Sequence, residues 1–197
     1  MPATIGVLAL QGDFEMHRLV FSELDAATVC VRRPDELSAC KALVIPGGES
    51  TTLARLIDRN GLRQALLDFA AVKPVMGTCA GLILLARELA PETGGDHGVR
   101  PLGLLDCEVQ RNGYGRQIDS FIANISAEPF LASPEPFRGV FIRAPRILAQ
   151  GRGVEVVATH GAEPVGIRQK HILGLAFHPE LSGNVGIHAA FLRGVGS

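Results

Sequence analysis

The chain has 197 residues, of which 47% are hydrophobic and 20% charged, and its formal net charge at pH 7 is −1. These proportions are typical of a globular protein, and the length predicts a single domain over residues 1–197. The balanced charge argues against a nucleic acid or an anionic membrane as partner. No apolar run reaches the ~18 residues of a membrane-spanning helix.

The first residues carry neither a basic region nor a small-residue cleavage site, so no secretory signal is expected. Four cysteines occupy positions 30, 40, 79 and 107, without the CxxC pair of a zinc ribbon or redox motif. The even count permits two disulfides, whereas the lack of a signal favours free thiols in a reducing cytoplasm. We therefore expect a cytoplasmic protein with no metal and no cofactor.

Short apolar segments alternate with helical periodicity in the first half of the chain. Uninterrupted apolar residues predict strands at 4–10, 28–31, 42–45 and 74–77. Apolar residues three or four apart predict helices at 14–24, after residue 50, at 62–71 and at 80–89, with Ser50 or Thr51 capping the second of them. This alternation predicts an α/β fold, a mainly parallel sheet covered by helices on both faces.

The second half of the chain is richer in strands. Apolar segments predict extra strands at 102–109, 140–142, 154–159, 164–168 and 172–177, and helical spacing returns at 185–192. The polar, glycine-rich segment 91–100 is predicted to be a surface loop.

Cys79 lies in the segment Gly77-Thr78-Cys79-Ala80-Gly81, between a predicted strand and a predicted helix. This is the form of a nucleophile elbow, with cysteine where related hydrolases have serine. Flanking glycines permit a sharp turn that exposes the side chain, and the start of the helix helps to stabilise a thiolate. The backbone N–H of Ala80 is placed to donate to an oxyanion. The alternative is a glycine-bounded turn around an inert, buried cysteine.

A thiol nucleophile needs a base, and the base needs a group that orients it. His178 directly follows a predicted strand and Glu180 comes two residues later, so both side chains are expected on one side of an extended segment. Glu180 would accept from one ring nitrogen of His178 while the other faces Cys79, because the carboxyl ends of parallel strands meet at one edge of the sheet. The alternative is a solvated ion pair at a strand end.

The segment 46–51, Pro-Gly-Gly-Glu-Ser-Thr, follows another predicted strand. Gly47 and Gly48 let the backbone approach a ligand closely and offer N–H donors to a developing negative charge. A turn followed by a helix cap at Ser50 or Thr51 explains the same residues without a ligand. The two interpretations are compatible.

In this order, segments 46–51, 77–81 and 178–180 resemble the motifs of the class I glutamine amidotransferases, so their flavodoxin-like fold is expected. The chain is more closely similar to the glutaminase subunits of pyridoxal 5′-phosphate synthase, the PdxT family, over about residues 5–191. Segments 6–12 (GVLALQG), 111–121 (RNGYGRQIDSF) and 140–145 (VFIRAP) carry this closer resemblance.

The resemblance implies a catalytic triad. Cys79 would attack the side-chain amide of L-glutamine, forming a γ-glutamyl thioester and releasing ammonia, with His178 as general base and acid and Glu180 as its orienting group. The residues implied to bind glutamine are Gly47, Gly48, Glu49, Ser50, Arg111, Ile142 and Arg143, with Gly48 and Ala80 at the oxyanion. An arginine suits this pocket because a guanidinium grips a carboxylate through two hydrogen bonds. Without the resemblance, Arg111 is better explained as a solvated surface charge.

The resemblance also implies a partner, a PdxS-like synthase barrel subunit that receives the ammonia and makes pyridoxal 5′-phosphate (vitamin B6) within a hetero-oligomer. It places Gln11 and Gly12 on the side that docks and completes the oxyanion site. The alternatives are a glutaminase component of another amidotransferase or a γ-glutamyl hydrolase, against which segment 111–121 argues. A binding subunit without chemistry is a further alternative, against which the intact Cys, His and Glu argue.

Overall fold

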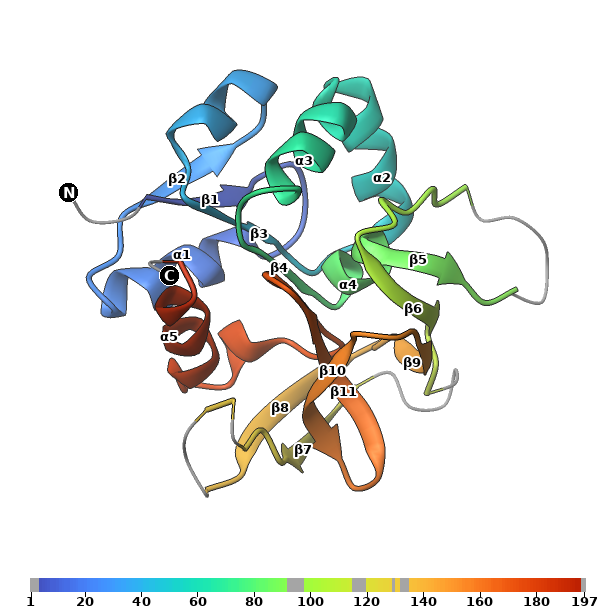
Figure 1. Cartoon of the computed structure of the whole chain (residues 1–197). Coiled ribbons are helices and arrows are strands. Elements are labelled where there is room, and N and C mark those ends of the chain that lie inside the picture. The colour runs from blue at the N-terminus through green and yellow to red at the C-terminus, as the bar shows by residue number, and fades with distance from the viewer. Residues whose placement is uncertain (1–3, 92–97, 115–119, 129, 132–134, 196–197) are drawn as a thin grey trace.

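The computed structural model of the chain describes residues 4–91, 98–114, 120–128, 130–131 and 135–195. A seven-stranded sheet runs through its centre in the order β10-β11-β12-β4-β3-β1-β2 (Figure 1). Its parallel part consists of β1 (Ile5–Leu8), β2 (Thr28–Val31), β3 (Ala42–Ile45), β4 (Val75–Thr78) and β12 (Ile172–Leu175). β10 (Glu155–His160) and β11 (Glu163–Gln169) add an antiparallel edge. The predicted, mainly parallel sheet is confirmed.

Helices cover both faces of this sheet. α1 (Phe14–Glu23) and α5 (Gly186–Arg193) lie side by side on one face, whereas α2 (Ser50–Arg59), α3 (Leu62–Ala70) and α4 (Ala80–Leu85) lie on the other (Figure 1). Two short 3₁₀ helices, η1 (Pro34–Ala39) and η2 (Pro179–Leu181), interrupt the connections. Strands β1, β3, β4 and β12 are buried along their whole length, because helices shield them on both sides.

Of the extra strands predicted in the second half, 154–159, 164–168 and 172–177 join the main sheet, and the others belong to two smaller sheets. β5 (Ala86–Leu89), β6 (Leu105–Gln110) and β9 (Arg146–Gln150) make one, and β7 (Ser120–Ile125) and β8 (Phe137–Ile142) form an antiparallel pair. Buried aromatic rings join this pair to the main sheet, since Phe177 lies 6.0 Å from Phe137 and 5.7 Å from Phe141 between ring centroids. One hydrophobic core therefore includes residues of all three sheets.

Several local predictions are wrong. The helix predicted at 80–89 ends at Leu85, because residues 86–89 pair with β6 as strand β5, and this tertiary pairing overrides the helical spacing. Strands β7 and β9 were not predicted, since β7 is only partly buried and β9 is mostly exposed. Most of the loop predicted at 91–100 lies outside the described residues.

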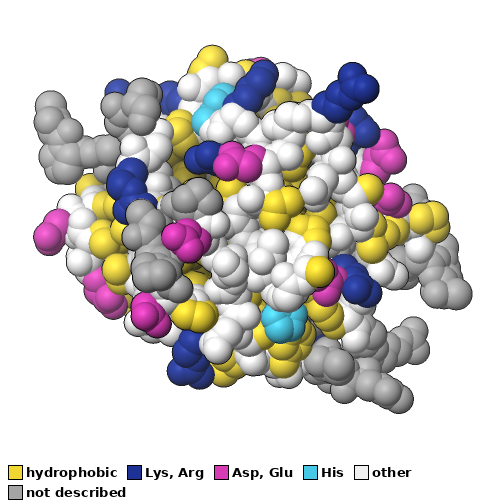
Figure 2. Space-filling view, turned by 60° about the horizontal axis from the view of Figure 1, so that its bottom comes forward, with side chains coloured by type: hydrophobic (Ala, Val, Ile, Leu, Met, Phe, Trp, Pro, Cys, Tyr) yellow, Lys and Arg dark blue, Asp and Glu magenta, His cyan; other side chains and the backbone are white. Residues whose placement is uncertain are grey.

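The surface matches the balanced composition. On the face seen in Figure 2, Lys and Arg side chains are interspersed with Asp and Glu, and neither sign gathers in a block. Within the described ranges, no helix has the length and apolar character needed to cross a membrane.

Close packing of α4 on the sheet generates a first prediction. A Cβ on Gly81 would collide with the backbone carbonyl oxygen of Ile45, which cannot move without disturbing β3. Gly81→Ala should therefore lower the free energy of unfolding by about 1–3 kcal/mol, measured by urea denaturation. Gly194→Ala is the control, because its new Cβ would lie 3.4 Å from the Phe191 oxygen, an ordinary contact. Equal stability of the two variants would contradict this packing argument.

Candidate active site

A cavity of about 240 Å³ opens at the carboxyl edge of the parallel strands. Loops that follow β1, β3, β4 and β12 meet there with residues next to β6 and β8. The lining residues are Gln11, Gly48, Glu49, Ser50, Cys79, Ile83, Arg111, Asn112, Ile142, Arg143 and His178. The structure thus brings together in one cavity nine residues that the sequence analysis proposed for a site, from segments up to 167 positions apart.

Cys79 stands at the turn between β4 and α4 in a strained conformation. Its φ of 50° and ψ of −103° lie where a residue with a side chain is rarely found. The strain therefore falls on the cysteine itself, whereas Gly77 and Gly81 allow close packing against Leu85 and Ile45 rather than supplying the turn. The Sγ atom lies 3.7 Å from the carbonyl oxygen of Ile142. Ala80 is buried directly behind it, as the first residue of α4.

His178 and Glu180 form a buried pair at the end of β12. Nδ1 of His178 donates to Oε1 of Glu180 over 2.7 Å, and Glu180 is only 2% exposed. The two side chains meet because the chain turns into η2 at Pro179, not because the segment is extended, so that part of the prediction is wrong. The alternative of a solvated ion pair is excluded by the burial of both residues.

The charges of this pair follow from its contacts. Burial lowers the pKa of His178, but hydrogen bonds to Cys79 and Glu180 outweigh it and raise the pKa to about 10. Burial likewise raises the pKa of Glu180, yet the imidazoles of His17 and His178 that face it bring about a net lowering. His178 is therefore a strong base in contact with both the thiol and an ionised carboxylate.

Three glycines let the loops after β1 and β3 touch. A Cβ on Gly12, whose φ is 90°, would overlap the carbonyl oxygen of Gly47, and a Cβ on Gly47 would overlap the ring of His178. Gly48 has a φ of 148° and lies against the side chain of Gln11, whose Oε1 accepts from the N–H of Glu49 over 2.9 Å. Glycine is needed here for close approach and for backbone conformation.

Glu49 caps helix α2, which corrects the prediction that Ser50 or Thr51 does so. Its carboxylate accepts from the N–H groups of Thr51 and Thr52, at 3.0 and 2.7 Å, and from the Thr52 hydroxyl. Although burial works in the opposite direction, these hydrogen bonds lower the pKa of Glu49 to about 2. Ser50 is buried at the first helical position.

The opposite wall of the cavity comes from the second half of the chain. Arg111 follows β6, and its guanidinium lies 3.4 Å from the Thr51 hydroxyl. Ile142 ends β8 and Arg143 follows it with a φ of 43°, a strained conformation for a residue with a side chain. The alternative of Arg111 as a mere surface charge is weakened, since it faces the cavity.

The predicted site residues and the residues that line the cavity differ in two ways. Gly47, Ala80 and Glu180 do not line the cavity, although Gly47 and Glu180 contact His178 and Ala80 directly follows Cys79. Ile83 and Asn112 line it and were missed. Ile83 sits one helical turn after Cys79, a spacing that could have revealed it, whereas nothing in the local sequence distinguishes Asn112.

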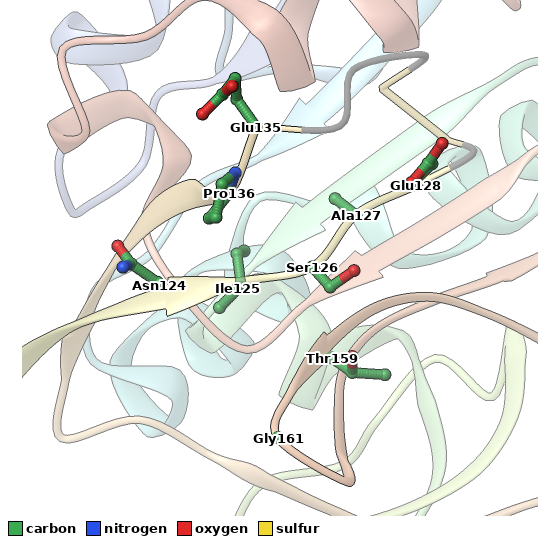
Figure 3. Close-up of a pocket in the computed structure, with 9 residues that line it drawn as sticks. All are labelled: Asn124, Ile125, Ser126, Ala127, Glu128, Glu135, Pro136, Thr159 and Gly161. Carbon is green, nitrogen blue, oxygen red and sulfur yellow. The ribbon is translucent and has the colours of Figure 1, made fainter.

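A second cavity, of about 290 Å³, has a different character. Figure 3 shows that its side chains come from the end of β7, the segment before β8 and the β10–β11 turn. It contains none of the candidate residues. Among the residues that the structure describes, no three His, Cys, Asp or Glu side chains cluster as metal ligands do.

A parallel α/β sheet with a cysteine on a strained turn facing a buried His–Glu pair defines the class I glutamine amidotransferase fold. A crystal structure of a glutamine amidotransferase matches with a TM-score of 0.89 and 39% identity, over 98% of this chain and 99% of that one. A glutamine amidotransferase of Thermotoga maritima, at 17% identity, shares the fold with a TM-score of 0.59 over 91% of this chain and 77% of its own.

The chain belongs to the SNO glutamine amidotransferase family, whose model matches residues 7–197. It is 49% identical over 190 residues to the pyridoxal 5′-phosphate synthase subunit PdxT of Pelotomaculum thermopropionicum, covering 96% of this chain and 93% of the relative. It is 45% identical to the subunit of the same name from Thermococcus onnurineus, covering 96% and 97%. The predicted resemblance and fold class are confirmed.

The Glu49 cap generates a prediction with a defined pH dependence. Because the pKa of Glu49 is about 2 in the folded chain, against its ordinary 4.5, the cap stabilises fully above about pH 4.5 and is lost as the pH falls toward 2. Glu49→Gln should lower the free energy of unfolding by about 1 kcal/mol at pH 7, and this difference from wild type should shrink below pH 4.5.

Urea denaturation at pH 7, 4.5 and 3 measures this difference. Glu23→Gln makes the same chemical change at an exposed position in the last turn of α1, and is the control. A difference between Glu49→Gln and wild type that stays constant over this range would show that the carboxylate does not cap α2.

Proposed function

We propose that this chain is the glutaminase subunit of a pyridoxal 5′-phosphate synthase, which hydrolyses L-glutamine to L-glutamate and ammonia. The observation that carries the proposal is the contact chain from Cys79 through His178 to Glu180 at the wall of a cavity. The relatives named as PdxT subunits, at 44–49% identity, supply the particular synthase.

In the first half-reaction, Cys79 is the nucleophile. His178 takes the thiol proton, which its raised pKa favours, and the sulfur attacks the side-chain carbonyl carbon of glutamine. The oxygen gains negative charge, and the N–H groups of Gly48 and Ala80 are proposed to stabilise it. His178 then gives its proton to the nitrogen, the C–N bond breaks, and ammonia leaves a γ-glutamyl thioester on Cys79.

In the second half-reaction, water replaces the thiol. His178 removes a proton from the water as it attacks the thioester carbonyl, and the collapse of that intermediate breaks the C–S bond. Glutamate leaves, and the proton returns to the thiolate. Glu180 holds the ring of His178 in one orientation and stabilises its cationic form through both half-reactions.

The cavity suits a single amino acid. Its volume of about 240 Å³ lies below the roughly 300–1,000 Å³ of sites for drug-sized ligands. We assign the binding of glutamine to Gly47, Gly48, Glu49, Ser50, Arg111, Ile142 and Arg143. Arg111 supplies a positive charge for the α-carboxylate, and Glu49, ionised because its pKa is lowered, a negative charge for the α-ammonium group.

The ammonia is proposed to pass to a PdxS-like synthase barrel subunit within a hetero-oligomer. The word "subunit" in the names of the relatives supports such a complex. A cytoplasmic site of action is proposed as well, because a thiol nucleophile has to stay reduced, and all four cysteines are free. The hydrophobic core shared by the three sheets supports one glutaminase domain over residues 1–197.

The decisive experiment measures glutamate release from L-glutamine by the complex with the synthase subunit. Cys79→Ala should reduce kcat by at least about 1,000-fold while leaving the fold intact. Cys30→Ala, which removes a half-buried thiol on β2, is the matched control and should keep full activity. If Cys79→Ala retained wild-type turnover, the proposed nucleophile would be wrong. Copurification with a different acceptor enzyme would instead replace the synthase as partner.

The loss of kcat should be larger when the proposed base is removed than when its orienting group is removed. His178→Asn removes the group that moves the proton and should abolish almost all turnover. Glu180→Gln keeps an acceptor oxygen beside the ring and should lose less, because it acts only through His178. Both are measured as kcat in the same complex, and a greater loss for Glu180→Gln than for His178→Asn would contradict these roles.

A further inference from the structure

Two buried histidines continue the triad away from the cavity. His17 of α1 and His188 of α5 are both fully buried, on the two helices that lie side by side on one face of the sheet (Figure 1). Nδ1 of His17 lies 2.9 Å from Nε2 of His188, and Nε2 of His17 lies 3.4 Å from Oε2 of Glu180. Neither residue lines the cavity, so contact with glutamine does not explain why these two histidines are buried here.

His17 lies close both to Glu180 and to the residue next to Cys79. Its Nε2 lies 3.2 Å from the hydroxyl of Thr78, the residue directly before Cys79, as well as facing Glu180. Oε1 of Glu180 accepts from His178, whereas Oε2 is buried and has no hydrogen-bond partner among the described residues. A buried carboxylate oxygen without a donor is destabilising, and Nε2 of His17, at an ion-pair distance of 3.4 Å, is the group that faces it.

The direction of the hydrogen bonds follows from the carboxylate. An ionised carboxylate only accepts, so Nε2 of His17 carries the hydrogen and its Nδ1 accepts. Nε2 of His188 must then donate to His17, which leaves Nδ1 of His188 without a hydrogen. This agrees with its surroundings, since that atom is buried with no hydrogen-bond partner in the part of the chain that the structure describes.

Both histidines act as neutral groups. Burial is the largest cause that lowers the pKa of His17, and burial and the neighbouring His17 lower the pKa of His188 to about 3. The ring of Phe21 packs edge-on against His188 at 5.0 Å between centroids, which restricts its rotation. The pair therefore offers Glu180 one directed N–H rather than a second positive charge.

We propose that His17 is a positioning residue that fixes Glu180, and through it His178, and that His188 holds His17 in the required tautomer. This inference rests on the proposed function for its kinetic readout. A carboxylate held at both oxygens cannot rotate, so the imidazole is held at the angle at which it reaches the Cys79 sulfur. If the two histidines served packing alone, His188 would not need to donate to His17, nor His17 to Glu180.

The test compares two conservative substitutions of His17. Gln extends its amide N–H to about the place of Nε2, toward Glu180, whereas Asn places its N–H near Nδ1, toward His188. With L-glutamine and the synthase subunit present, His17→Gln should keep kcat within about threefold, and His17→Asn should lose on the order of 10- to 100-fold with KM little changed. Equal activities of the two variants would overturn the inference, whatever their stability.

A second readout needs no substrate. The rate at which iodoacetamide alkylates Cys79 in the full chain, followed by mass spectrometry of its peptide, reports how well His178 activates the thiol. The same order, wild type and His17→Gln above His17→Asn, is expected. If the order holds but no glutamine is hydrolysed, the proposed function fails while the positioning role stands. If glutamine is hydrolysed and the rates are equal, the positioning role alone fails.

Coupling to Glu180 separates positioning from packing. In the Glu180→Gln background, His17→Asn should cause little further loss of kcat, since its effect passes through that carboxylate. A full additional loss of kcat would assign His17 to packing only.

The role of His188 is tested by the rate at which iodoacetamide alkylates Cys79. In His188→Gln, which keeps a hydrogen-bond donor, this rate should stay within about twofold of wild type, and in His188→Leu it should be several-fold lower. Equal rates would remove His188 from the chain of positioning residues.

Discussion

The site depends on the parallel pairing of β4 with β3 on one side and β12 on the other. Met76 stands opposite Val44 and Leu173 in this register. Strands that run in one direction end at one edge, so the turn that carries Cys79 is held between the loops of Gly47 and His178. Each strand is buried on both faces, which leaves the register little freedom to slip. The separation of Cys79 and His178 is thus determined by sheet geometry.

Close approach of the backbone is the second constraint. At Gly12, Gly47 and Gly81 a side chain would collide with a backbone carbonyl or with the ring of His178. Because these residues have no side chain, three loops and the start of α4 contact one another or the adjacent strand. The positive φ of Cys79 is sustained by this packing, because an isolated turn would relax to a less strained conformation.

Burial gives the connected polar side chains of Cys79, His178, Glu180 and His17 their chemical properties. Glu180 remains ionised in the interior because imidazoles face both of its oxygens, and His178 becomes a strong base because a thiol and a carboxylate flank it. The same groups in water would have neither fixed geometry nor strong coupling. Helices α1 and α5, none of whose residues lines the cavity, enter the reaction only through the directed N–H of His17 proposed here.

Local patterns determined much of this protein. The alternation of strands and helices, the turn at Cys79 and the His178–Glu180 pair are short-range features, so the α/β class and the family could be predicted from them. Motif order alone does not reveal which residues from later segments complete the cavity, as Asn112 shows. The helix predicted at 80–89 failed because its last four residues form a strand with β6, a partner that follows in the chain. His17 and His188, separated by 171 positions, met only once α1 and α5 packed on the same face of the sheet. The general reason is physical: hydrophobic periodicity and turn chemistry act over a few residues, whereas the direction of a hydrogen bond between distant groups exists only after the sheet has ordered them.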